Sequence, residues 1–262
     1  MRIVTPLHVE AVGDGPPLVL LHGWAMHGGL FATLVPSLAQ RFRVHVVDLP
    51  GHGHSPAVAP YTLDALVAAL AARFAAEDEP VSVLGWSFGA TVALRWAQRH
   101  PDVVTRLVLV CATPRFVADG EWTSAMDAQT LARFGDELAV AYRLTLQRFL
   151  TLQVQGSDEG RATLGALRDA LFARGEPTPQ TLAAALSILA GTDLRDDVRG
   201  IEAPALVVSG QRDALTPPAA GAWLAQAMPA ARHVEIAGAA HAPFLSHRAA
   251  FDAATAEFLD AR

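Results

Sequence analysis

Short runs of β-branched residues and leucine, each bounded by glycine or proline, recur along this chain and constrain its fold more than any other feature. They span residues 17–23, 43–51, 81–87, 106–112, 204–210 and 233–238. Helical patterns such as 62–76 and 89–99 lie between them. Because strands that alternate with helices form parallel sheets with right-handed crossovers, the pattern predicts an α/β fold, a mostly parallel central sheet flanked by helices.

The alternation stops after the run at 106–112, and no convincing strand follows until residue 204. Helical periodicity takes its place at 126–134, 137–155, 160–173 and 179–190. An insertion after a strand end lies over the carboxyl edge of an open α/β sheet, where ligands bind. We therefore expect a single domain over residues 1–262, with a helical cap inserted at about 114–190.

Composition limits the possible partners. A chain of 262 residues with 52% apolar content can bury a large core, and a net charge of −6 gives no general attraction for nucleic acid. Cys111 is the single cysteine, so no intrachain disulfide can form, and its apolar surroundings predict a buried strand position. The start of the chain lacks a signal-peptide pattern, and no run of 18 apolar residues occurs. We expect a cytoplasmic monomer with neither a membrane nor a nucleic-acid partner.

A candidate nucleophile lies where one of the apolar runs meets a helical pattern. Residues 85–89 read Gly-Trp-Ser-Phe-Gly, between the apolar run VSVL and the helical pattern ATVALRWAQRH. In a G-x-S-x-G turn between strand and helix, small flanking residues allow a strained backbone that exposes the central hydroxyl. The motif predicts that Ser87 is a catalytic nucleophile.

A serine hydroxyl needs an imidazole to remove its proton and a carboxylate to orient that imidazole. Asp213 follows the strand run at 204–210, and His241 follows the last one at 233–238. Both should lie at the carboxyl edge of the sheet, in the chain order serine, acid, histidine that this arrangement uses. We predict that Asp213 and His241 complete the catalytic set.

Other residues compete for these roles. His247 is the rival of His241, but it stands just before AFDAATAEFLDA and should open the terminal helix. Three aspartates precede the strand at 204–209 and should therefore lie at the opposite edge of the sheet, which disfavours them as the acid: Asp193, Asp196 and Asp197.

Acyl transfer also requires two N–H groups to hold the developing oxyanion. The residue after the nucleophile supplies one, the amide of Phe88. The second should come from the loop after an early strand, where LLHGWAMHGG offers the amide of Trp24. His22 then has a structural role.

The H-x-H spacing of His52 and His54 occurs in binuclear metallohydrolases, but Ser55 and Pro56 stand where a further Asp-His pair would be needed. We expect a tight turn there and no metal site. The predicted chemistry requires no cofactor.

Several motifs together resemble the α/β-hydrolase superfamily over nearly the whole chain. More narrowly, the chain resembles the pimeloyl-acyl-carrier-protein methyl ester esterases of biotin synthesis. The motifs that carry this resemblance are LLHGW at 20–24, VDLPGHG at 47–53, LGWS at 84–87, RFLTLQ at 148–153 and AAHAPFLSH at 239–247.

The resemblance implies a substrate, a pocket and a partner. The reaction would be hydrolysis of a methyl ester on an acyl chain carried by acyl-carrier protein, without a cofactor. The residues that the family would use to bind substrate correspond here to Trp24, Ser87, Phe88, Phe149, Leu150, Thr151, Leu152, Gln153 and His241.

The resemblance also implies that arginines of the cap bind the acidic carrier protein through complementary charge. Arg148 and Arg161 fall on matching positions, whereas Leu144 and Gly165 stand where arginine is expected. Arg143 and Arg168 lie near those two positions and are the further docking candidates.

The predicted triad is compatible with other hydrolases. A general short-chain carboxylesterase, a C–C bond hydrolase, a lactonase and a perhydrolase could all use it. Haloalkane dehalogenases and epoxide hydrolases are disfavoured because they carry a carboxylate at the position of Ser87. A non-catalytic ligand receptor on the same fold is disfavoured by the intact triad.

Overall fold

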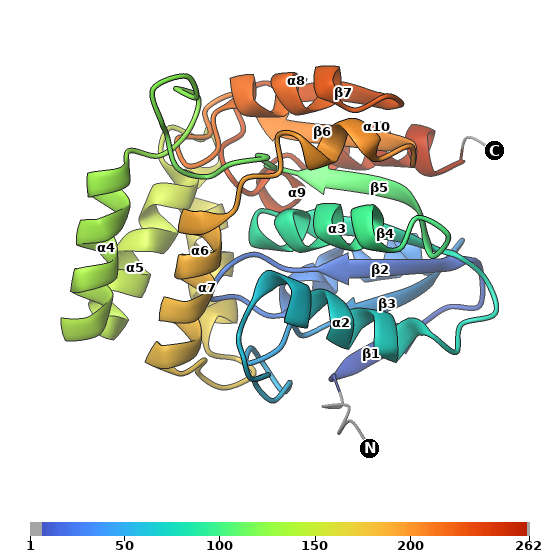
Figure 1. The fold of residues 1–262 in the computed structure, drawn as a ribbon, viewed down its shortest axis with the longest axis horizontal. Helices are drawn as coiled ribbons and strands as arrows, with labels where there is room; N and C mark the ends of the chain where they lie inside the picture. Colours follow the sequence, from blue (N-terminus) through green and yellow to red (C-terminus); the bar gives the residue numbers. More distant parts are fainter. Residues whose placement is uncertain (1–6, 261–262) are drawn as a thin grey trace.

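The computed structural model describes residues 7–260 and contains one seven-stranded sheet (Figure 1). Its strands are β1 (Val9–Val12), β2 (Pro17–Leu21), β3 (Arg43–Val47), β4 (Val81–Trp86), β5 (Val104–Val110), β6 (Ala205–Gly210) and β7 (Ala231–Ile236). They lie in the order β1-β3-β2-β4-β5-β6-β7, and every pairing is parallel except that of β1 with β3. The predicted α/β class is confirmed.

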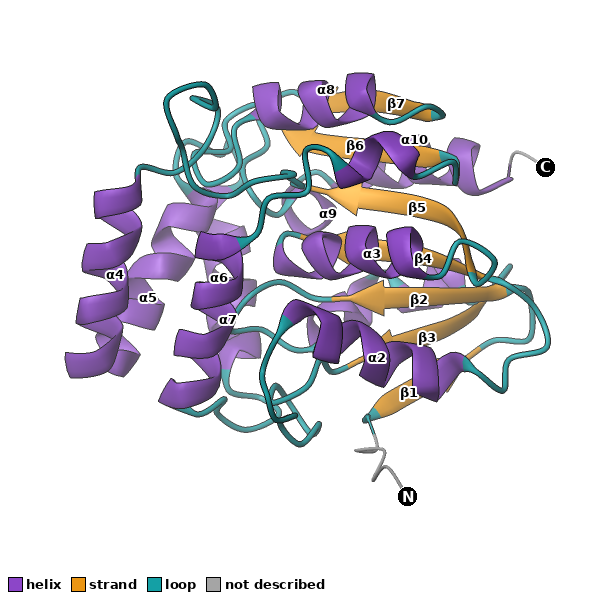
Figure 2. Ribbon diagram, viewed as in Figure 1, coloured by secondary structure: helices purple, strands orange, loops and turns teal. Residues whose placement is uncertain are grey.

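Helices cover both faces of the sheet (Figure 2). One layer consists of α2 (Leu63–Phe74), α3 (Phe88–Arg99) and α8 (Pro218–Ala227). The elements of the other face are η1 (Gly28–Thr33), α1 (Val35–Leu38) and α10 (Arg248–Asp260), while η2 (Asp197–Gly200) and α9 (Pro243–Ser246) are short connections. Within residues 7–260, no helix has the length and apolar character needed to cross a bilayer.

Burial explains which strands could be read from the sequence. All five residues of β2 are buried, as expected for a parallel strand covered by helices on both faces. Edge strand β1 is different, because Glu10, Ala11 and Val12 are exposed and only Val9 is partly covered. It therefore lacks the run of buried apolar residues found in β2 to β6, and β7 at the other edge is also largely uncovered, with Ile236 its one buried residue.

Four helices lie between β5 and β6, and Figure 1 shows them beyond the carboxyl ends of the parallel strands. They are α4 (Ala128–Val140), α5 (Tyr142–Val154), α6 (Gly160–Leu171) and α7 (Pro179–Gly191), and they are called the cap helices below. The predicted gap at residues 135–136 is wrong, because α4 continues through Gly135 and the chain turns at Ala141. We propose that the cap helices and the sheet belong to one domain.

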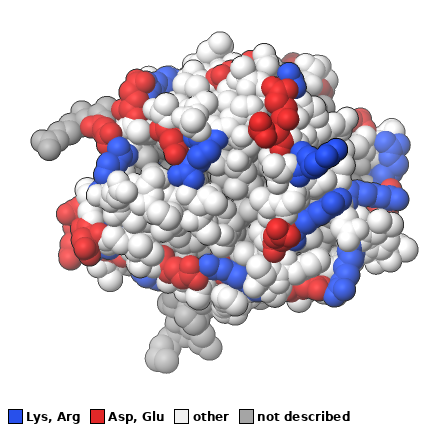
Figure 3. All heavy atoms as spheres, turned by 180° about the vertical axis from the view of Figure 1, so that it is seen from behind, with Lys and Arg blue, Asp and Glu red and all other residues white. Residues whose placement is uncertain are grey.

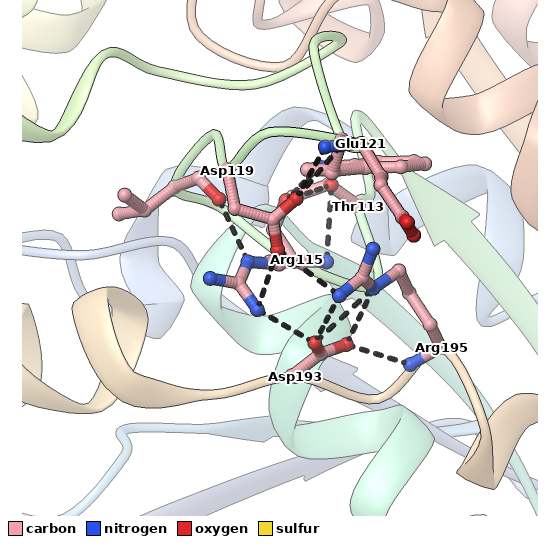
Figure 4. A network of polar contacts seen from close by, with 8 residues as sticks. Thr113, Arg115, Asp119, Glu121, Asp193 and Arg195 are labelled. Carbon is pink, nitrogen blue, oxygen red and sulfur yellow. Dashed lines mark hydrogen bonds and ion pairs between the residues drawn. The ribbon is translucent and has the colours of Figure 1, made fainter.

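The two ends of this insertion meet in a network of ion pairs (Figure 4). Asp193 accepts hydrogen bonds from Arg115 Nη1 and Arg195 Nη2, both at 2.7 Å, and Arg195 also reaches Asp119 at 3.2 Å. The amide of Leu194 donates to the carbonyl of Pro114, just beyond β5. Asp193 therefore lies near the carboxyl edge of the sheet, so its expected position at the opposite edge is wrong. The chain leaving α7 pairs with the chain leaving β5 before it turns toward β6.

Candidate active site

Ser87 occupies a strained turn between β4 and α3. Its backbone has φ 55° and ψ −116°, a combination that L-residues rarely adopt. A side chain on Gly85 would come within 2.6 Å of the carbonyl oxygen of Gly89, and one on Gly89 would collide with the carbonyl of Leu21 on β2. The glycines of the motif are thus required by close backbone approach, and the turn holds the Ser87 hydroxyl at the carboxyl edge.

His241 connects the serine to the aspartate. Its Nε2 lies 2.9 Å from Ser87 Oγ, and its Nδ1 lies 2.7 Å from Asp213 Oδ2. With the proton on Nδ1, the ring donates to the carboxylate and leaves Nε2 free to accept the proton of the serine hydroxyl. The fold therefore brings together three residues that are separated by as many as 154 positions in the sequence.

The backbone of His241 is also held on both sides. Its N–H donates to the carbonyl of Gln153 at 3.0 Å, and its carbonyl accepts from Trp86 Nε1 at 2.7 Å. Gln153 belongs to α5, whereas Trp86 is the last residue of β4. A cap helix and the nucleophile strand therefore fix the histidine loop together.

Asp213 is 4% exposed and accepts hydrogen bonds on both oxygens. Oδ1 accepts from the amides of Leu215 and Thr216 at 2.9 and 3.0 Å, and Oδ2 accepts from His241 and from the Thr216 hydroxyl. Burial alone would raise the pKa of this carboxyl, but the charge and hydrogen bond of His241, together with the bonds from Thr216, hold that pKa below its ordinary value. Asp213 is thus held as an anion facing the imidazole.

Thr216 is a member of this network that sequence reasoning missed. Its Oγ1 lies 2.7 Å from Asp213 Oδ2, 3.0 Å from the carbonyl of Cys111 and 3.3 Å from His241 Nδ1. The signal in the sequence was the D-x-x-T spacing, which lets a hydroxyl fold back on the carboxylate within a turn. The hydroxyl has one proton, so at any moment it donates either to the carboxylate of Asp213 or to the carbonyl of Cys111, and its oxygen lies within reach of His241 Nδ1.

Cys111 lies beside the aspartate and the histidine. Within residues 7–260, Cys111, Asp213 and His241 form the one set of His, Cys and acidic side chains whose possible ligand atoms all approach within 4.8 Å. Burial, and then the nearby charge of Asp213, raises the pKa of the Cys111 thiol. His241 of this set is hydrogen-bonded to both Asp213 and Ser87, and a neutral buried thiol is a poor ligand.

The predicted oxyanion donors lie on two adjoining turns. Phe88 is the first residue of α3, so its amide has no acceptor inside the helix. The amide of Trp24 has no acceptor among the described residues, and the turn around it is closed by a bond from Met26 N to Gly23 O at 3.2 Å. His22 shapes the same turn, because its Nδ1 donates to Gly23 O at 2.8 Å and its Nε2 accepts from Leu49 N at 2.9 Å.

Of the two histidines in the DLPGHGH segment, His52 packs against His22 of this turn. The rings of His52 and His22 lie 5.3 Å apart, and His52 Nδ1 contacts the carbonyl of Pro50. Burial lowers the pKa of His52 to about 4, and burial together with His52 lowers that of His22 to about 3. Both rings are neutral near pH 7. His54 instead packs edge-on against His8, with ring centroids 4.9 Å apart.

An apolar pocket lies above Ser87. Trp24 forms part of its wall, packing edge-on against Phe134 and Phe149 with ring centroids 5.5 and 5.0 Å apart. Its indole donates to the carbonyl of Leu182 on α7 at 3.0 Å. The residues that line the pocket are Trp24, Ser87, Phe116, Met126, Thr130, Leu131, Phe134, Phe149, Leu152, Leu186, Leu189, Leu215 and His241.

The residues expected to bind substrate are only partly among these. Phe149 and Leu152 line the pocket, as do Trp24, Ser87 and His241. The remaining four predicted residues are not among the lining residues: the side chains of Phe88, Leu150 and Gln153 are buried elsewhere in the core, and Thr151 is exposed. Phe149 and Leu152, three positions apart, are the two residues of α5 that line the pocket, so one contiguous motif cannot supply the whole wall.

The four predicted docking arginines are exposed on the cap helices. Arg143 pairs with Glu176 at 2.5 Å and Arg148 with Glu137 at 3.1 Å, while Arg161 and Arg168 have no ion-pair partner within residues 7–260. Figure 3 shows arginine side chains gathered on the side of the molecule that the cap helices form, with acidic side chains among them. The surface is mixed in charge.

Known proteins resemble this chain in sequence over most of its length. Residues 16–248 match a family model described as the alpha/beta hydrolase fold. A protein of Chromobacterium violaceum named pimeloyl-(acyl-carrier protein) methyl ester esterase is 47% identical over 254 residues, which cover 97% of this chain and 98% of the relative. A protein of the same name from Nitrosomonas europaea is 45% identical, covering 92% of this chain and 94% of its own length.

Solved structures show the same fold. An esterase from Exiguobacterium antarcticum superposes with a TM-score of 0.87 at 22% identity, over 97% of this chain and 96% of that one. An enol-lactonase from Burkholderia xenovorans superposes with a TM-score of 0.83 at 26% identity, over 97% and 96% of the two chains. Different reactions are thus found on closely similar backbones.

Proposed function

The chain belongs to the alpha/beta hydrolase fold family, and we propose that it is a serine carboxylester hydrolase that cleaves the methyl ester of pimeloyl-acyl-carrier protein, giving pimeloyl-acyl-carrier protein and methanol for biotin synthesis. The observation that carries this proposal is the 47% identity over 97% of the chain to a relative bearing that name. The hydrogen-bonded chain from Ser87 to Asp213 beneath an apolar pocket supports it.

In the first half of the reaction, His241 Nε2 removes the proton of Ser87 as Oγ attacks the ester carbonyl. The 2.9 Å separation of these atoms suits proton transfer. The amides of Trp24 and Phe88 hold the oxyanion, and Asp213 stabilises the imidazolium that forms. His241 then gives its proton to the departing methanol oxygen, leaving the acyl chain on Ser87.

In the second half, the same histidine activates water. Water adds to the acyl carbonyl while His241 takes its proton, and the bond to Ser87 Oγ breaks as the proton returns to that oxygen. The acid is released and the enzyme is regenerated. The reaction needs no cofactor.

The carrier protein would dock on the cap helices, and the enzyme would act as a cytoplasmic monomer. Arg148 and Arg161 are exposed, on α5 and α6, and their charge is complementary to an acidic carrier. Reversing these charges would weaken the encounter without touching the wall of the pocket.

The test compares purified variants on two substrates. Arg148→Glu and Arg161→Glu should lower kcat/KM for pimeloyl-carrier methyl ester by about tenfold and leave a short p-nitrophenyl ester unchanged. Arg99→Glu, at the far end of α3, is the matched control and should change neither rate. Equal losses on both substrates would argue against docking at these arginines.

The biological substrate is tested by growth. The gene should restore biotin-independent growth to a bacterial strain that lacks its own esterase, and Ser87→Ala should not. Failure of the wild-type gene, with the protein present and active on small esters, would favour the alternative of a general short-chain carboxylesterase.

A further inference from the structure

The wall of the pocket contains no acidic or basic side chain apart from His241 at its floor. Ser87 and His241 form the floor, Thr130 on α4 contributes the one other polar side chain, and the remaining lining residues are aliphatic, aromatic or methionine. An ionised group placed among them would lose its hydration without gaining a hydrogen-bond partner. The pocket is therefore suited to an uncharged chain along its whole length.

No arginine lines this wall, and three arginines that are close in sequence to lining residues already have polar partners. Arg133 Nη2 contacts the Thr130 hydroxyl at 3.1 Å, but the carboxylate of Asp127 contacts the same hydroxyl at 2.9 Å. Arg212 is paired with Asp158 at 2.5 Å, and Arg115 is paired with Asp193. None of these cations is a lining residue, and each has an acidic partner near it.

We propose that this pocket selects esters whose acyl chain ends in an uncharged group, such as a thioester, an amide or a second ester, and rejects the same chain when it ends in a free carboxylate. The inference rests on the proposed attack of Ser87 on an ester carbonyl. It adds a requirement at the opposite end of the acyl chain, which the ester chemistry itself does not impose.

The selection depends on the length of the acyl chain. Thr130 is exposed and Leu152 is 40% exposed, so these two lining residues mark where the pocket meets solvent. A distal carboxylate on a short chain lies inside the apolar wall. On a longer chain it passes the rim and recovers its water shell, so the discrimination fades. A neutral thioester arm leading to a carrier satisfies the requirement at any length.

The test uses two homologous series, the dimethyl esters and the monomethyl esters of straight-chain diacids. We measure kcat/KM at about pH 8, where the free carboxyl group is ionised. After division by two for the second ester group, the diester should be preferred at least about 30-fold for the shorter acids. The preference should fall toward one as the chain lengthens, whereas a ratio near one at every length would overturn the proposal.

The outcomes separate this inference from the proposed function. Turnover of neither series would contradict the proposed ester hydrolysis itself. Turnover of both with equal efficiency would contradict only the selection. If the monoesters are turned over well and Arg133→Gln removes that activity, the arginine serves the distal carboxylate and the selection for neutral chains is wrong.

A variant designed to reverse the selection against carboxylates provides a stricter test. Leu189→Arg places a cation in the wall and should raise the monoester-to-diester ratio of kcat/KM at least about tenfold, because the carboxylate gains a partner. Leu189→Gln is the matched control of similar size without charge and should leave the ratio close to wild type. Since both values are ratios measured on one protein, partial loss of folded enzyme does not affect them. An unchanged ratio in Leu189→Arg would contradict the proposal.

Discussion

The loops at the carboxyl edge of the sheet and the cap helices both face Ser87, but they hold their polar groups differently. At the sheet edge, Asp213 is almost fully buried and each of its oxygens accepts two hydrogen bonds. On the cap helices, the side chains of Arg143 and Arg148 are more than half exposed and each makes a single ion pair. The surface of the cap helices that faces the pocket is apolar.

This difference indicates that the two regions have different roles. Buried, multiply bonded groups keep one geometry, which a proton transfer over 2.9 Å requires. Exposed ion pairs contribute little to stability and can exchange partners, which a docking surface requires. Perturbing the sheet edge should therefore change the rate by orders of magnitude, and perturbing the cap surface should not.

The largest effect is expected at the nucleophile. Ser87→Ala removes the hydroxyl that His241 deprotonates, so kcat on a short p-nitrophenyl ester should fall by about 10⁶. The far-ultraviolet circular dichroism and melting temperature should remain those of the wild type, because Ala fits the same turn. Activity within tenfold of wild type would refute the assignment of Ser87.

Next comes the orienting acid, for which the two regions provide a matched pair. Asp213→Asn should lower kcat by about 10⁴, because the amide favours the wrong tautomer of His241. Asp193→Asn, in the ion-pair network of Figure 4, should cost less than about threefold. Steady-state kinetics of the two variants measure which substitution costs more activity, and the opposite ranking would show that the catalytic carboxylate is misassigned.

A smaller effect is expected at Thr216, which we regard as a positioning residue. Thr216→Val keeps the shape but removes a hydrogen-bond donor to Asp213, so kcat/KM should fall by about tenfold. The acidic limb of the pH profile of kcat/KM should move to higher pH, because the less solvated carboxylate stabilises the protonated imidazole more strongly.

Thr216→Ser is the conservative variant that retains the hydroxyl. It should restore both the rate and the position of the acidic limb. A purely structural role for Thr216 would lower the amount of folded protein and leave the pH profile in place.

The smallest effects are expected when the ion pair of either of two arginines in the inserted segment is removed. Arg174, between α6 and α7, reaches the fully buried Asp48 at 3.4 Å, so Arg174→Met should destabilise the fold by about 2 kcal/mol and lower Tm by roughly 5 °C. Arg148→Met breaks an exposed pair and should lower Tm by about 1 °C or less. Thermal unfolding of the two variants measures the contrast, and equal shifts would remove the distinction between buried and exposed pairs.

Much of the candidate catalytic centre could be predicted from the sequence because its signals are local. The glycines around Ser87 are required by close backbone approach, within the turn at Gly85 and from β2 at Gly89, and five of the six predicted strands are mostly buried apolar runs. Since parallel strands end at one edge, the residues that follow them had to converge. That reasoning predicted that Asp213 and His241 would meet Ser87.

Other features depend on contacts that no local pattern encodes. The place of Asp193 is set by pairing with Arg115 across the whole insertion, and the exposed strand β1 is held by its ladder to β3. The wall of the pocket combines residues as distant as Trp24, Phe134 and Leu215. The chain by itself determined the fold class and the order of the candidate catalytic residues, because strand burial and turn strain are local. Only the tertiary structure decided the neutral character of the pocket and the bond of Thr216 to the carbonyl of Cys111, because both bring together groups that lie more than a hundred residues apart.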